Sequence, residues 1–455
     1  MISCLEKLQG HLPTNQLTML HRITTITICL LLATSFMVSA QPKKVVPKSQ
    51  IKNQKSEIRP GAHQLAEYLP LLKGKRVAIF ANQTSAIGQV HLVDTLLKLG
   101  VNIKTIFSPE HGFRGDADAG EHVNSSIDPA TGIPIISLYG DHKKATIDDL
   151  KDIDILLFDL QDVGLRYYTY INNVQECMES AIAANKPLII LDRPNPNGFF
   201  VDGPLLEDGF QSGVGRQSVP IVYGMTMAEY ASFLYGEKLL NKSMYQFTDA
   251  APPLKILLGK YEPLKLTIIK CKNYDHNSYY ELPIKPSPNL PNMQSVLLYT
   301  SICFFEGTDV SLGRGTDKPF QIYGAPSLPD TLPYSFTPVS TPGAKNPPLK
   351  DKRCHGYDLS NIPIDITRKE NRQINLDYIL NAYKLFPNKD SFFLRPRKGN
   401  PSTTDYFFNK LAGNDKLMWQ IMNGKTEAEI RKSWVPGITA FKKIRKKYLL
   451  YKDFE

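Results

Sequence analysis

Short apolar runs alternate with amphipathic stretches between residues 75 and 271, and this alternation is the most regular feature of the chain. The apolar runs predict buried strands. They lie at residues 75–81, 102–107, 154–160, 186–191 and 264–271. Between them, apolar residues recur at helical spacing and predict helices at 91–99, 174–184 and 226–240. Repeated strand–helix–strand units predict an α/β fold with a Rossmann-like, doubly wound, mostly parallel sheet.

The pattern changes near residue 283. Four prolines fall between Pro283 and Pro291, and eight more lie between Pro319 and Pro348, which is a poor composition for an alternating α/β core. Apolar residues return at helical steps from Asp405 onward and end in a basic amphipathic segment, residues 441–450. We therefore expect an N-terminal domain at 62–283 and a smaller α+β domain at 284–455, with an active-site cleft between them.

The first 40 residues have the pattern of a secretory signal. An uncharged apolar stretch, Ile23–Val38, follows Arg22 and precedes Ser39-Ala40, which are small residues suited to a cleavage site. We expect a signal peptide at 1–40, cleavage after Ala40, a basic linker at 41–61 and export, to the periplasm in the first place, with secretion or association with the cell surface as alternatives. The apolar stretch is too short for a comfortable membrane span, so no span is expected after cleavage.

Composition narrows the possible partners. The chain has 455 residues, of which 42% are hydrophobic and 22% charged, so it is neither collagen-like nor disordered, nor a multi-pass membrane protein. Its net charge is +10, and removal of residues 1–40 leaves 52 basic and 43 acidic side chains. Much of the basic excess lies in 41–59 and 442–447, which we interpret as a solvated tether and a solvated helix face. We expect no nucleic-acid partner.

Four cysteines remain after the expected signal: Cys177, Cys271, Cys303 and Cys354. They are scattered, they form no Cys-x-x-Cys pair, and no histidine stands beside them at metal-ligand spacing. We expect buried free thiols or at most two disulfides, and no metal site.

Polar residues follow the predicted strands directly. In a doubly wound sheet, ligands bind outside the carboxyl ends of the strands, so these residues are the first candidates for a site. Asn82, Asp162 and Asn195 lie at three such ends and are candidate substrate-binding residues. No strand is followed by Gly-x-Gly-x-x-Gly, a phosphate-binding loop or a Gly-x-Ser-x-Gly elbow. We therefore expect no nucleotide cofactor and no serine triad.

The strand predicted at residues 102–107 is followed by a carboxylate that could act in catalysis. Glu110 follows a strand, and a glycine-rich loop leads from it to Glu121. Glycoside hydrolysis needs a protonated carboxylic acid together with a second carboxylate or an internal nucleophile, and this pair meets that requirement. Alternatively, one or both glutamates bond to Arg114 or cap a helix. His111, next to Glu110, is either a structural donor or a base.

Three arginines near the strand ends are candidates for holding an anionic substrate: Arg114, Arg166 and Arg193. A guanidinium binds a carboxylate with two parallel hydrogen bonds, although each of these arginines could equally form a structural ion pair. Tyr168, flanked by Tyr167 and Tyr170, fits both core packing and sugar stacking. Glu306, Arg314 and Thr316 in the second domain are weaker candidates for closing the cleft.

Several segments resemble those of the bacterial exo-β-N-acetylmuramidase family, once filed as a domain of unknown function. They are residues 81–85 (ANQTS), 107–115 (FSPEHGFRG), 159–170 (DLQDVGLRYYTY), 191–198 (LDRPNPNG) and the terminal 441–450 (FKKIRKKYLL). The resemblance covers nearly everything from residue 62 to 455.

The resemblance implies a Rossmann-like domain packed on a smaller domain, and an enzyme that releases N-acetylmuramic acid from the non-reducing ends of peptidoglycan fragments. The family's motif glutamates fall on Glu110 and Glu121, and we expect Glu110 to be the principal acid. Peptidoglycan-derived muramyl saccharides, whose lactyl group is a carboxylate, are then the expected partners. Two alternatives stay open: a non-catalytic protein that binds such fragments, and a hydrolase of another anionic amino sugar. Retaining, inverting and substrate-assisted routes are all compatible with the sequence.

Overall fold

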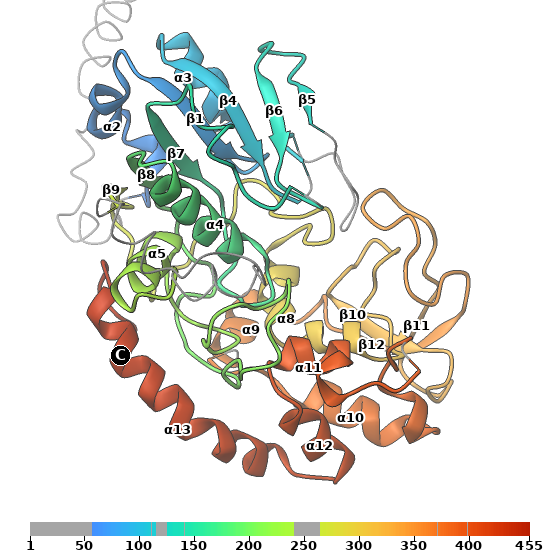
Figure 1. Ribbon diagram of the computed structural model, residues 1–455. Helices are drawn as coiled ribbons and strands as arrows, with labels where there is room; N and C mark the ends of the chain where they lie inside the picture. Colours follow the sequence, from blue (N-terminus) through green and yellow to red (C-terminus); the bar gives the residue numbers. More distant parts are fainter. Residues whose placement is uncertain are drawn as a thin grey trace, which may run out of the picture. The chain divides into compact units, whose positions relative to one another are not determined.

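The computed structural model describes residues 57–110, 112–114, 125–140, 142–240, 264–370, 372–397 and 399–455 (Figure 1). The expected signal peptide, almost all of the basic linker, His111 and Glu121 lie outside these residues. Residues Glu57–Glu455 group into a single unit by their contacts.

A seven-stranded sheet forms the N-terminal half, with the order β5-β6-β4-β1-β7-β8-β9 (Figure 1). All neighbours pair in parallel except β5, which runs antiparallel to β6. The strands are β1 (Arg76–Ala81), β4 (Asn102–Ser108), β5 (Ser126–Ile127), β6 (Pro134–Ser137), β7 (Ile155–Asp159), β8 (Leu188–Leu191) and β9 (Leu266–Ile269). The predicted mostly parallel sheet is therefore confirmed.

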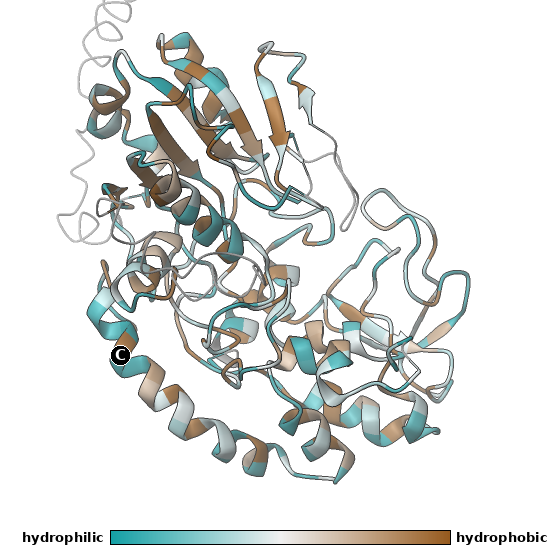
Figure 2. Ribbon diagram, viewed as in Figure 1, coloured by the Kyte–Doolittle hydropathy of each residue, from teal (hydrophilic) through white to brown (hydrophobic). Residues whose placement is uncertain are grey.

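The two faces of this sheet belong to different hydrophobic cores. Val77 and Ile79 of β1 pack with α2 (Leu65–Leu72) and α3 (Leu92–Lys98), whereas Ala78 and Phe80 pack with α4 (Tyr170–Ala183) and α5 (Met227–Gly236). Side chains alternate between the faces of a strand, so a strand covered on both faces must be apolar throughout. Figure 2 shows the central strands as continuous apolar bands.

The strands and helices predicted for this half are present, with shifted ends. The largest shifts are of four residues: α5 ends at Gly236 rather than at residue 240, and α4 begins at Tyr170 rather than at residue 174. The first turns of α4 carry Asn172 and Asn173, which are buried although they are polar. Because of these two residues, the start of the helix shows no regular spacing of apolar residues in the sequence. Four of the described strands of this half were not predicted, because they are short. They are β6, which begins at a proline, the two-residue strand β5, and the hairpin of β2 (Ala86–Ile87) and β3 (Val90–His91).

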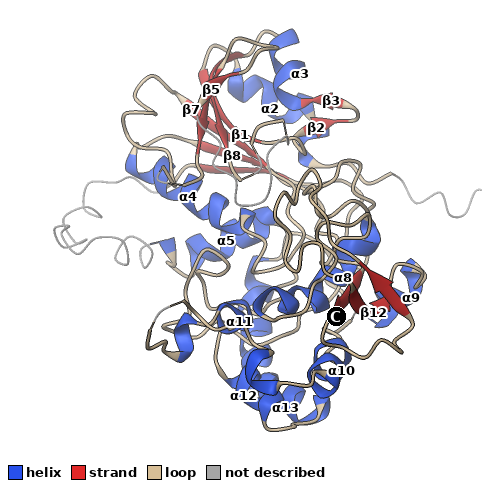
Figure 3. Cartoon of the chain, turned by 90° about the vertical axis from the view of Figure 1, so that its right-hand side faces the viewer, coloured by secondary structure: helices blue, strands red, loops and turns tan. Residues whose placement is uncertain are grey.

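The C-terminal half combines helices with a three-stranded antiparallel sheet of order β10-β12-β11 (Figure 3). Its strands are β10 (Ile322–Ala325), β11 (Tyr334–Phe336) and β12 (Cys354–Asp358). Its α-helices are α8 (Met293–Ile302), α9 (Ile364–Glu370), α10 (Asp377–Leu385), α11 (Phe407–Ala412), α12 (Lys416–Met422) and α13 (Glu427–Arg445). The short 3₁₀ turn η4 (Cys303–Gly307) follows α8. The predicted helical tail is confirmed.

One hydrophobic core crosses the boundary predicted near residue 283. It contains Phe80 and Phe158 of the parallel sheet, Val296 of α8, and Ile430 and Trp434 of α13. The two halves therefore share buried contacts, and the exact division at 283 stays a prediction.

The C-terminal segment is less solvated than its basic sequence suggests. Arg445 is fully buried; its Nε donates to Gly224 O at 2.8 Å and its other nitrogens pair with Asp453. Leu450 N donates to Glu229 at 2.8 Å, and Tyr451 OH donates to Asp192 at 2.6 Å. The expectation of a wholly solvated helix face at 442–447 is wrong at Arg445, because that buried side chain binds Gly224, in the segment before α5, and Asp453.

Cys177, Cys271, Cys303 and Cys354 are all free and buried. Burial raises the pKa of each thiol, which keeps it in the unreactive protonated form. Among the described helices, none is both long and apolar enough to cross a membrane.

Candidate active site

Glu110 stands just beyond the carboxyl end of β4, where two cavities meet. One cavity, of about 460 Å³, lies against α4, and the other, of about 140 Å³, reaches toward the C-terminal half; both are lined by Glu110 and Thr169. Thr169 precedes the first turn of α4, and its Oγ1 donates to Glu110 Oε2 at 3.2 Å. The carboxyl group thus lies at the N-terminal end of α4.

The smaller cavity brings together residues from both halves of the chain. Tyr168 and Tyr170 line it from one half, and Glu306 and Arg314 from the other. Arg314 donates twice to Glu306 Oε1, from Nε at 2.9 Å and from Nη2 at 2.5 Å. The prediction that Glu306 and Arg314 help to close a cleft with Glu110 is consistent with this arrangement. Thr316 instead donates to Gly313 O and does not line the cavity.

Asn82 acts on this cavity indirectly. It is fully buried, and its Nδ2 donates to Tyr170 OH at 2.7 Å while its Oδ1 accepts from Thr84 N at 2.9 Å. Tyr168 donates to Pro286 O at 2.7 Å, and its ring stacks edge-on against Tyr170 with centroids 4.7 Å apart. Asn82 therefore fixes the position of Tyr170, and the tyrosine pair forms a rigid wall beside Glu110.

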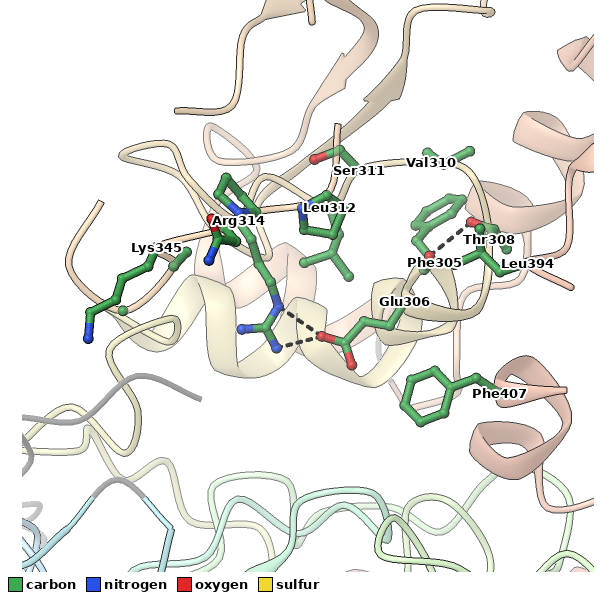
Figure 4. A pocket seen from close by; sticks show the side chains of 15 residues that line it. Phe305, Glu306, Thr308, Val310, Ser311, Leu312, Arg314, Lys345, Leu394 and Phe407 are labelled. Carbon is green, nitrogen blue, oxygen red and sulfur yellow. Dashed lines mark hydrogen bonds and ion pairs between the residues drawn. The ribbon is translucent and has the colours of Figure 1, made fainter. Parts of the chain in front are cut away.

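A third cavity, of about 570 Å³, continues from the smaller one into the C-terminal half, since Glu306 and Arg314 line both. Figure 4 shows the Arg314–Glu306 pair and Phe407 among its lining side chains. Phe407 is 38% exposed and Leu394 is 44% exposed. Exposed apolar groups beside Ser311 and Arg314 give this cavity the mixed character typical of a binding site for a small molecule.

Most residues that line the cavity against α4 have polar or charged side chains. It is lined by Glu110, Lys143, Thr169, Asn172, Asn173, Glu176, Gln211, Ser212 and Arg216, together with Leu138, Tyr139, Gly140 and Gly213. Arg216 pairs with Glu176, whose other oxygen accepts from Asn173 Nδ2 at 3.1 Å. The buried amides and acids of α4 therefore face this cavity, which explains why the helix is polar on one buried side.

Arg114 forms an ion-pair cluster. Its Nε and Nη2 donate to Asp128 at 3.1 and 2.8 Å, and its Nη1 and Nη2 donate to Asp94 at 3.3 and 3.2 Å. All three guanidinium nitrogens thus face carboxylates of the protein. This arrangement favours the structural ion pair over the expected role in binding substrate.

Arg193 and Arg166 also serve the fold in this arrangement. Arg193 makes a buried two-bond pair with Asp159, at 2.6 and 2.8 Å. Arg166 is fully buried and donates to four carbonyl oxygens at 2.7–3.0 Å. The acceptors are Pro204 O, Val219 O, Leu411 O and Ala412 O. These contacts favour a structural role for both arginines over the expected role of holding an anionic substrate, and neither side chain lines the three cavities described above.

Asp162 and Asn195 lie in two different strand-end loops, and their side chains stabilise the contact between these loops. Asp162 Oδ2 accepts from Gly164 N at 2.6 Å and from Tyr223 OH. Gly164 has φ +80°, and a Cβ there would lie 2.2 Å from Asn195 Oδ1. Asn195 Nδ2 donates to Met225 O at 2.8 Å. The glycine allows the two strand-end loops to touch, and both polar side chains are buried in that contact.

Asp162 predicts a measurable pH dependence of stability. Burial raises its pKa to about 7, so between about pH 4 and pH 7 the folded protein keeps a proton that the unfolded chain releases. The free energy of unfolding contributed by this group therefore falls as the pH rises through that window. Asp162→Asn should remove this contribution, and urea unfolding at a series of pH values would measure it. A wild-type-like pH slope in the variant would contradict the assignment.

The sequence did not point to the α4 cavity. Lys143, Asn172, Asn173, Glu176 and Arg216 were not candidates, because they do not directly follow a strand. The only indication in the sequence was the composition of α4, which carries two amides in its first turns and acidic residues further along.

Among the described residues, no group of three or more His, Cys, Asp or Glu side chains is placed to hold a metal ion.

Comparison with known proteins gives two matching family models. The model described as exo-β-N-acetylmuramidase NamZ, N-terminal, matches residues 77–294, and its C-terminal counterpart matches 297–451. Peptidoglycan β-N-acetylmuramidase NamZ of Bacillus subtilis strain 168 is 36% identical over 411 residues, which cover 85% of this chain and 89% of that protein.

Two solved structures are similar to this chain over most of its length. A DUF1343 family protein from Bacteroides fragilis is similar with a TM-score of 0.75 and 45% identity, covering 88% of this chain and all of that one. A second DUF1343 protein from the same organism has a TM-score of 0.69 and 27% identity, covering 87% of this chain and 99% of that one.

Proposed function

We infer that this chain, which belongs to the exo-β-N-acetylmuramidase NamZ family, is a glycosidase that releases N-acetylmuramic acid from the non-reducing ends of peptidoglycan fragments. Both family models match, and the Bacillus subtilis relative, named as a peptidoglycan β-N-acetylmuramidase, matches over 85% of the chain. Within the fold, the observation that best supports this function is the position of Glu110 between two cavities at the carboxyl end of β4.

Glu110 is the proposed general acid. A glycosidic oxygen placed at the junction of the two cavities would have the muramyl residue on one side and the leaving sugar on the other. Proton transfer from Glu110 to that oxygen would break its bond to the muramyl C1 and release the leaving sugar, and water would then add to C1 and return a proton to Glu110. Glu306 is the second carboxylate of the small cavity, paired there with Arg314. The motif residue Glu121 remains the candidate for the second catalytic carboxylate, on the muramyl side.

A turnover assay tests the function itself. The purified protein should release N-acetylmuramic acid from a synthetic muramyl glycoside, with the products identified by mass spectrometry. Binding of muramyl fragments without turnover at any pH would instead support a non-catalytic binding protein. Release of a different acidic amino sugar in preference would support the third possibility.

The 570 Å³ cavity is the proposed site for the leaving side of the substrate. Phe407 presents an exposed ring there, so Phe407→Ala should raise the KM for a muramyl oligosaccharide about tenfold, because apolar contact is lost. The KM for a chromogenic muramyl monosaccharide, which lacks further sugars, should stay unchanged. Trp419→Ala removes an aromatic side chain of 58% exposure that does not line this cavity, and it is the matched control. Equal KM changes for both substrates would contradict the assignment.

We also propose that the protein is exported to the periplasm and takes part in cell-wall recycling. The signal-like pattern of residues 1–40 supports export. N-terminal sequencing of the protein from a periplasmic fraction should give a mature chain that starts at Gln41.

A further inference from the structure

The substrate assigned under the proposed function carries a carboxylate, yet the arginines expected to bind it are engaged elsewhere. Arg114 faces two aspartates, Arg193 faces Asp159, and Arg166 faces four carbonyl groups. Another cation close to Glu110, among the described residues, is therefore the next candidate for recognising the lactyl group.

Two cations line the cavity between Glu110 and α4, and they are Lys143 and Arg216. Lys143 is exposed, and it makes no hydrogen bond or ion pair with any described residue. Arg216 donates through Nη2 to Glu176, and within the described part of the chain its Nε and Nη1 have no partner. The cavity thus presents one free ammonium group and a guanidinium with unused donors.

The orientation of Arg216 is fixed from behind. Glu176 is 5% exposed, and Asn173 Nδ2 donates to its second oxygen at 3.1 Å. An arginine held in this way loses little conformational freedom when it binds a ligand, and a guanidinium matches the two oxygens of a carboxylate.

The balance of charges among the residues that line this cavity permits an anion to bind there. Glu176 balances Arg216, and Lys143 is balanced only while Glu110 is ionised. In the protonated form that a general acid requires, Glu110 is neutral, and the cavity then carries one uncompensated positive charge. The N-terminal end of α4 adds its dipole in the same direction.

We propose that Lys143 and Arg216 form a carboxylate-binding subsite that holds the lactyl carboxylate of the muramyl residue next to Glu110. This places the muramyl residue in the 460 Å³ cavity and the leaving sugar in the cavities lined by Glu306. The inference rests on the proposed function and adds to it the side chains that distinguish muramic acid from glucosamine.

The test uses two substrates that differ in one group: a muramyl glycoside with a free lactyl carboxylate, and the same glycoside with that group converted to its methylamide. The wild-type protein should have a lower KM for the carboxylate. Lys143→Gln should raise that KM about ten- to hundredfold, as expected when a charge-assisted hydrogen bond is lost. The KM for the amide should change less than twofold, and Lys143→Arg should restore the preference.

Lys144→Gln is the matched control, because Lys144 is the next residue but pairs with Glu179 and does not line the Glu110 cavity. It should leave both KM values unchanged. A wild-type enzyme that turns over both substrates with equal KM would overturn the subsite and leave the proposed function standing. A Lys143→Gln variant that affects both substrates equally would also overturn it. Failure of the wild-type protein to release any muramic acid would refute the proposed function instead.

Discussion

Replacement of Glu110 by Gln should lower kcat for release of N-acetylmuramic acid from a natural disaccharide by about a hundredfold to ten-thousandfold, the range for loss of a positioned general acid. Gln keeps the size of the side chain and can still accept from Thr169 Oγ1, so the fold around β4 should be retained. The measurement is steady-state release of muramic acid, with circular dichroism and the melting temperature as checks on folding.

The leaving group makes this experiment specific for an acid. An aryl muramyl glycoside with an acidic phenol needs little protonation, so Glu110→Gln should lose much less activity on it than on the disaccharide. Equal losses on both substrates would mean that Glu110 is required for something other than proton donation. Glu207→Gln is the control: it changes a partly exposed carboxylate that pairs with Lys416 and lines none of the three cavities, and it should leave both rates unchanged.

Truncation of Arg166 should be the most destabilising single change in this part of the fold. Arg166→Met keeps much of the apolar stem but leaves four buried carbonyl oxygens without their donor. Removal of one partner from a buried charged network typically costs about 3–5 kcal/mol of the free energy of unfolding. Urea unfolding of the wild-type and variant proteins would measure this loss.

The same variant distinguishes a structural from a substrate-binding Arg166. If it serves the fold, the variant should keep a wild-type KM at a low temperature where it is still folded. A stable variant with a strongly raised KM would restore the original expectation of substrate contact. Arg166→Lys should be intermediate in stability, since an ammonium group has fewer donors and cannot reach all four carbonyls.

The central fold could be predicted because its strands are buried on both faces. Strand β1 and its neighbours need apolar residues at every position, and such runs are visible without any partner. The pairing of β6 and the antiparallel β10–β12 ladder depends on contacts between distant residues. Short strands that begin at proline or sit in a proline-rich stretch give little local signal for such contacts.

The candidate site was predicted in part. Glu110 was found because it directly follows a strand, and the position of a residue at a strand end is a local property. Arg166 and Arg193 also follow strands, but their partners are carbonyls and a carboxylate elsewhere in the chain. Whether a guanidinium faces a ligand or the protein depends on those partners. Lys143 and Arg216 reach the cavity from loops, so no strand or helix pattern points to them.

The buried tail has a consequence for how the protein folds. Arg445 and Gly224 are 221 residues apart in sequence, and Tyr451 and Asp192 are 259 apart, so these contacts contribute strongly to a high contact order. The environment of α5 and Asp192 is incomplete until Leu450 and Tyr451 have been synthesised. Folding of the α/β half therefore cannot finish before those residues are available, and exposed apolar surface must be protected from aggregation until then.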